Sequence, residues 1–62
     1  MKRWYALFTL KGKPVLGCWV EESRWTKNEE HAVISAEFKS YFVAPNVEYE
    51  DITITQTEET AQ

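Results

Sequence analysis

Residues 3–21 read RWYALFTLKGKPVLGCWVE, and this stretch decides the fold. It holds two runs rich in aromatic and other strand-favouring residues, 3–10 and 15–21, separated by Lys-Gly-Lys-Pro. Because glycine and proline mark turns, the stretch predicts a β-hairpin. We expect a two-residue loop at Gly12 and Lys13, since glycine in the first loop position supplies the positive φ of a type II′ turn.

The loop position sets the register of the hairpin. The expected pairs are Leu10 with Val15, Phe8 with Gly17, Ala6 with Trp19, and Trp4 with Glu21. Trp4, Phe8 and Trp19 then share one face, because successive strand residues point to opposite faces. The opposite face carries Tyr5, Leu7, Thr9, Leu16, Cys18 and Val20. Both faces are therefore apolar, and we expect something outside the monomer to cover part of the aromatic surface.

Residues 26–43 predict a helix. Thr26-Lys27-Asn28-Glu29 matches a capping box with a hydroxyl at the N-cap, and proline at position 45 stops the helix. The helical pattern makes one broad apolar stripe, formed by Ala32, Val33, Ile34, Ala36, Phe38, Ser40, Tyr41 and Phe42. A strand over residues 31–36 is the alternative, because Ile34, Ala36 and Phe38 also alternate with their neighbours.

Residues 49–57, YEDITITQT, form the clearest strand, with Ile52 and Ile54 pointing inward and Thr53 and Thr55 outward. The element order is then β-β-α-β. This order predicts an α+β fold, a three-stranded antiparallel sheet of strand order 2-1-3 with one helix on one face. We expect a single domain over residues 1–57 and a flexible acidic tail over residues 58–62.

Size and composition favour association. A chain of 62 residues buries only ~60% of its unfolded surface, so small domains often depend on a disulfide, a metal or a partner. Cys18 is the only cysteine, which excludes an internal disulfide. With Cys18 and His31 as the only soft ligands, a structural zinc site is not expected. A homodimer is therefore the expected way to complete the core.

The charges divide the chain in two. Residues 1–39 hold all seven Lys and Arg and five acids, a net +2 from 7 − 5, whereas residues 40–62 hold five acids and no base, a net −5 from 0 − 5. Glu48, Glu50 and Asp51 are solvated residues of a strand edge in one interpretation. In the other they form an acidic surface for a basic partner.

The candidates for catalysis are few. His31 is the only histidine, and Cys18 lies in a strand among apolar residues, where a small buried side chain is the usual role. With only Gly12 and Gly17, the chain has no glycine-rich phosphate loop. We expect no enzyme activity, no catalytic residues and no cofactor. No apolar run approaches the ~18 residues of a membrane span, and we expect no signal peptide, because Met1-Lys2-Arg3 leads into only a short run that ends at Lys11. These features and the lone cysteine favour a cytoplasmic protein that does not bind membranes.

Binding is the expected function. The leading hypothesis is a protein-binding module that acts by covering a surface of its partner through Trp4, Phe8, Trp19 and Trp25. Trp25 either staples the first turn of the helix or is an exposed hot-spot residue. The alternative is a nucleic-acid-binding protein that stacks bases on the aromatic sheet face. Its phosphate contacts would come from Lys2, Arg3, Lys11 and Lys13.

In size, mild acidity, absence of a catalytic set and β-β-α-β layout, the chain resembles the small accessory proteins of bacteriophages, including inhibitors of host defence or replication enzymes. The resemblance covers the whole chain in outline and rests on no motif, so it assigns no role to an individual residue. It implies action by occlusion of a larger protein's surface.

Overall fold

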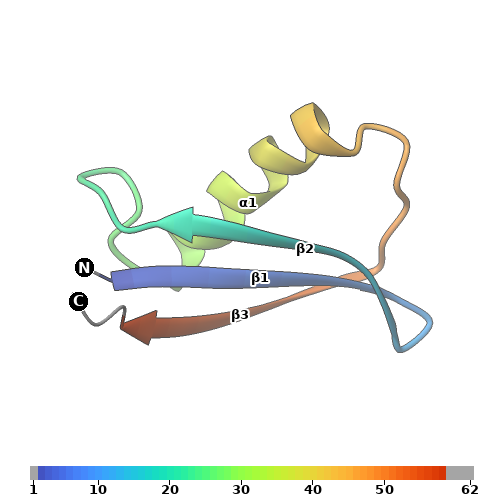
Figure 1. Cartoon of the computed structure of the whole chain (residues 1–62), viewed down its shortest axis with the longest axis horizontal. Coiled ribbons are helices and arrows are strands. Elements are labelled where there is room, and N and C mark those ends of the chain that lie inside the picture. The colour runs from blue at the N-terminus through green and yellow to red at the C-terminus, as the bar shows by residue number, and fades with distance from the viewer. Residues whose placement is uncertain (1, 59–62) are drawn as a thin grey trace.

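The computed structural model describes residues 2–58 and shows one antiparallel sheet with one helix (Figure 1). The elements are β1 (Lys2–Leu10), β2 (Lys13–Glu21), α1 (Glu29–Val43) and β3 (Asp51–Glu58), and the strand order is β2-β1-β3. The α+β fold and the strand order predicted from the sequence are confirmed. The alternative strand over residues 31–36 is wrong, because this segment lies inside α1. Strand β3 continues to residue 58, and the rest of the expected tail, residues 59–62, lies outside the described residues.

The hairpin turn lies one residue earlier than expected. Lys11 and Gly12 both have positive φ, at 53° and 77°, and Leu10 pairs with Lys13. Two consecutive positive φ values define a type I′ turn, not the expected type II′ turn. The backbone N–H of Lys11 donates to Oε1 of Glu50 at 3.1 Å, which ties the turn to the segment before β3.

A β-bulge then changes the register. Phe8 pairs with Leu16 but Thr9 pairs with Pro14, so Val15 is the extra residue on β2. The body of the hairpin consequently pairs residues one position away from the expected partners: Trp4 with Val20, Tyr5 with Trp19, Ala6 with Cys18 and Leu7 with Gly17. A one-residue slip moves a strand's side chains to the other face. The expected face shared by Trp4, Phe8 and Trp19 is therefore wrong.

The core lies between the sheet and the helix. It contains the buried residues Trp4, Ala6, Phe8, Cys18 and Val20 of the sheet and Ala32 and Ala36 of α1. Ile52 and Ile54 pack against this cluster, as predicted. Tyr49 closes one end, with its ring edge-on to Phe8 at a centroid distance of 4.8 Å.

The helix begins at Glu29, three residues later than predicted. Its N-cap is Asn28, whose side chain accepts a hydrogen bond from the backbone N–H of His31 at 3.0 Å. The capping role predicted for Thr26 is wrong, because that hydroxyl is buried and donates to the Glu21 carbonyl at 2.7 Å. The predicted end is confirmed, since α1 stops at Val43, two residues before the proline.

Candidate functional site

Helix α1 packs on the sheet through its small residues and turns its large ones to solvent. Its buried residues are Ala32, Ala36 and Ser40, which recur every fourth position on one side of the helix. The opposite side carries Ile34 (54% exposed), Phe38 (66%), Tyr41 (68%) and Phe42 (84%). We call these four residues the outer face of α1. Of the broad apolar stripe predicted for the helix, the sheet therefore buries only part.

A short loop presents Trp25 beside this face. The Oγ1 atom of Thr26 donates to the carbonyl of Glu21 and accepts from the backbone N–H of Ser23 at 3.0 Å. The Ser23 hydroxyl lies 3.1 Å from the same oxygen and accepts from the backbone N–H of Trp25 at 3.1 Å. These bonds brace the loop from inside, whereas the indole of Trp25 is 77% exposed.

A pocket of about 440 Å³ lies between this loop and the N-terminal half of α1. It is lined by Arg24, Trp25, His31, Ile34 and Ser35. The indole and the isoleucine make much of the lining apolar, and Ser35 leaves space because its side chain is small. The pocket adjoins the outer face of α1, since Ile34 belongs to both.

The sheet side away from α1 carries a second aromatic group. The Arg3 guanidinium lies 4.4 Å from the centre of the Trp19 ring, within cation–π distance, and that ring lies 4.9 Å from the Tyr5 ring. The Tyr5 hydroxyl lies over Gly17, where any Cβ would overlap it. We call Arg3, Tyr5 and Trp19 the sheet-face stack. Its flank on β3 is polar, since Thr55 pairs with Tyr5.

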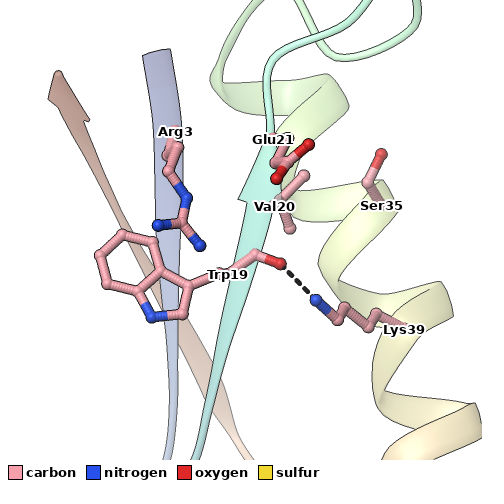
Figure 2. Close-up of a pocket in the computed structure, with 6 residues that line it drawn as sticks. All are labelled: Arg3, Trp19, Val20, Glu21, Ser35 and Lys39. Carbon is pink, nitrogen blue, oxygen red and sulfur yellow. Dashed lines mark hydrogen bonds between the residues drawn. The ribbon is translucent and has the colours of Figure 1, made fainter. Parts of the chain in front are cut away.

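The edge of β2 is partly closed by the helix. Glu22 N–H bonds to the carbonyl of Lys2, so by antiparallel alternation Trp19 turns its backbone groups away from β1. Figure 2 shows the result. The indole of Trp19 points toward Arg3, and the backbone carbonyl of Trp19 accepts a hydrogen bond from Nζ of Lys39 at 2.6 Å. A groove of about 360 Å³ runs along this edge. A lysine ammonium that lies at the edge strand in this way discourages pairing with further strands.

The structure separates the aromatic residues predicted as partner-binding. Trp4 and Phe8 are 4% and 0% exposed and belong to the core, so they offer no surface to a partner. Trp19 lies on the opposite side of the sheet and Trp25 lies beside α1. The exposure of the outer face of α1 was not predicted from the sequence. The signal for it is the recurrence of small residues every fourth position, at Ala32, Ala36 and Ser40, which indicates that their side of the helix packs closely and the opposite side does not.

The acids predicted as partner-binding, Glu48, Glu50 and Asp51, are all exposed, in the segment after α1 and at the first residue of β3. Glu50 accepts from the turn at Lys11, and the Asp51 carbonyl accepts from the Thr9 hydroxyl at 3.5 Å. These bonds give part of this segment a role in holding β3 against the hairpin.

Among residues 2–58, no three His, Cys, Asp or Glu side chains gather in a way that could hold a metal ion. Cys18 is buried and His31 is exposed. Tyr49 is a titratable residue with a shifted pKa. Burial and the adjacent Glu37 carboxylate, whose Oε2 accepts from the Tyr49 hydroxyl at 3.4 Å, raise the pKa of that phenol. The described residues contain no helix long and apolar enough to span a bilayer.

The fold and its surfaces define a small α+β chain with two uncovered aromatic groups, the outer face of α1 and the sheet-face stack. Comparison with family models, curated proteins and solved structures found no match.

Proposed function

We propose that this chain is a protein-binding module and that it binds protein through the outer face of α1. The observation that carries the proposal is the inverted packing of the helix, which buries two alanines and a serine and exposes Phe38, Tyr41 and Phe42. Exposed rings keep apolar surface in contact with water, which is unfavourable. Their exposure is explained if another protein surface covers them.

The size of the exposed surface supports the proposal. An aromatic side chain buries ~150–250 Å², so at their exposed fractions these three rings offer roughly 300–500 Å². The largest apolar patch on a typical monomer is ~300–600 Å² and is often functional. This chain reaches that range within a total accessible surface of 4838 Å². Aromatic side chains are also frequent hot spots of interfaces.

The proposed mode of action is occlusion. A chain that binds through apolar rings changes its partner by covering a surface and performs no chemistry of its own. This is the action implied by the resemblance to bacteriophage accessory proteins, and inhibition of a host protein is part of the proposal. The proposal also includes a cytoplasmic location, where the reducing environment keeps the single cysteine, Cys18, as a thiol.

Photocrosslinking inside the cell that produces the protein tests the proposal. A photoreactive amino acid replaces Phe38 on the outer face, and a matched chain carries it at Lys13, which is exposed at the far end of the hairpin. We expect crosslinks from position 38 to a polypeptide and none from position 13. Absence of any protein adduct from position 38, or equal yields from both positions, would contradict the proposal.

One observation favours a second candidate, nucleic-acid binding. The sheet-face stack combines a cation with two rings on an uncovered sheet side, an arrangement that binds single strands by stacking. Lys2 is adjacent to Arg3 in the sequence but alternates to the other side of the sheet, and Lys11 and Lys13 lie at the turn end of the hairpin. Binding to a fluorescent single-stranded oligonucleotide that weakens steeply with salt and is lost in Trp19→Ala would support this candidate. Binding that Trp19→Ala leaves unchanged would exclude the stack as its site.

A further inference from the structure

We propose that the protein covering the outer face of α1 is a second copy of the chain. In this dimer the two α1 helices lie antiparallel about a two-fold axis near Phe38, and Phe42 of each copy enters the partner's pocket beside Trp25. The inference rests on the proposed function, since it names the partner of the same face.

The pocket has the form of a hole in helix packing. Its helical lining residues, His31, Ile34 and Ser35, are spaced i, i+3 and i+4. Phe38, which does not line the pocket, follows on the helix at i+7. Four residues with this spacing form the hole that receives one side chain of a facing helix. Ser35 gives the hole depth, and Trp25 and Arg24 extend its wall beyond the helix.

Phe42 is the matching knob. It is the most exposed large apolar residue among those described, at 84%. At 100° per residue it lies within about a quarter turn of Ile34, Ser35 and Phe38, on the same side of α1 as the pocket.

The positions of knob and hole make the surface self-complementary. Phe38 lies four residues after Ile34 and four before Phe42, about 6 Å from each along the helix axis. A two-fold axis through Phe38 therefore brings Phe42 of one copy opposite Ile34 of the other, and the reverse contact follows by symmetry. Such a reciprocal contact defines a closed, isologous interface.

The available area fits a dimer of moderate strength. With Trp25 and Ile34 added to the three rings, each copy offers roughly 500–700 Å² of exposed side chain. Two copies together reach the ~1,000 Å² that a specific interface needs. Weak and transient complexes lie near this lower limit, and we expect a dissociation constant of the order of micromolar.

Two other arrangements use the same molecule less well. A parallel helix pair would set each Phe42 against its own counterpart and leave both pockets empty. An extended strand added to β2 would have to displace Lys39 from the Trp19 carbonyl, and Pro14 of β2 lacks the N–H that pairing requires. The antiparallel pair meets neither obstacle. Because it uses the outer face of α1, occlusion of a host protein by the dimer falls to the sheet-face stack, which stays uncovered in each copy.

Light scattering on the purified chain is the first test. We expect wild type at ~0.2 mM to approach twice the 7.3 kDa monomer mass. Phe42→Glu should weaken the dimer at least ~30-fold, because the residue is an anchor of the interface. Thr55→Glu adds the same charge on the other side of the sheet and should leave the mass unchanged. A monomer mass for wild type at ~0.5 mM would overturn the inference.

Cysteine trapping tests the geometry. Phe42→Cys and Ile34→Cys chains are mixed under mild oxidation, with wild type as the control because Cys18 is buried. We expect a disulfide between unlike chains, since an antiparallel pair brings residues 34 and 42 together. A disulfide confined to Phe42→Cys chains would indicate a parallel pair and overturn the inference, and so would trapping no stronger than in wild type.

The outcomes also separate this inference from the function beneath it. If the dimer is absent but position 38 crosslinks to a different protein, the module binds a foreign partner and only the inference fails. If the dimer is absent and position 38 crosslinks to no protein, both fail.

Discussion

The turn at Lys11 and Gly12 is the first of two features that set the register of the hairpin, and Lys11→Asn tests it. Lysine at a φ of 53° occupies the left-handed region, which costs an ordinary L-residue roughly 1–2 kcal/mol. Asparagine tolerates this region, and Asn-Gly is the preferred sequence of a type I′ turn. The substitution should recover about 0.5–1 kcal/mol of unfolding free energy, because it removes part of this strain. The backbone N–H that donates to Glu50 is kept.

Thermal unfolding followed by circular dichroism measures the gain. For a domain of this size 1 kcal/mol shifts Tm by roughly 4–8 °C, so Lys11→Asn should raise Tm by about 2–8 °C. Variants are compared at one protein concentration, because the proposed dimerisation would make Tm depend on concentration.

The matched control is Lys13→Asn, which loses the same charge at the first residue of β2. It should give no gain, because asparagine is unfavourable in strands. A higher Tm for Lys13→Asn together with an unchanged or lower Tm for Lys11→Asn would place the loop at Gly12 and Lys13 and refute the observed register.

Three further predictions concern the core, pH and the sheet edge. The Trp4 indole N–H is buried without a hydrogen-bond partner among the described residues. Trp4→Phe should therefore lower the free energy of unfolding by less than ~2 kcal/mol, against ~3–5 kcal/mol for Trp4→Ala. Equal losses of stability in urea unfolding would contradict this. The folded-state pKa of Tyr49 is raised above 10.0, so the stability held by its neutral phenol is complete below pH 10.0 and is lost as pH rises through the folded value. Urea unfolding at about pH 8 and pH 11 should therefore show a larger alkaline loss for wild type than for Tyr49→Phe, and equal losses would show that this phenol is not responsible. Lys39→Ala should uncover the Trp19 carbonyl and increase light scattering on heating, whereas unchanged scattering would mean that the edge is protected by other residues.

The sequence was sufficient for the layout because the elements that define it carry local signals. Pro45 ends α1 by simple sterics, and the alternation of Ile52 and Ile54 with threonines orients β3 on its own. The strand order follows from the element order and the rules of connection. None of these inferences depends on knowing how the hairpin is aligned.

The register was not predictable in the same way, because two compensating irregularities determine it. The loop lies one residue earlier through a positive φ at Lys11, a residue type that seldom adopts it, and this moves the partner of each β1 residue by two positions. The bulge at Val15 adds a residue on β2 and restores one of these two positions. Neither has a distinct sequence signal. Because strand side chains alternate, their combined shift of one position was enough to exchange the faces of Trp19 and Cys18.

The orientation of α1 follows from what the sheet already places in the core. Trp4 and Phe8, two large side chains, fill the side of the sheet that faces the helix. Interiors pack to uniform density, so large side chains on one layer require small ones opposite, and Ala32 and Ala36 meet that requirement. Turning Phe38 inward would add a third ring to a space that two rings fill, and overpacking of this kind is destabilising. The aromatic residues of the sheet thus exclude those of the helix from the core. The rings left outside lie in one row beside the pocket, and in the proposed dimer a second copy of the same chain supplies the surface that buries them.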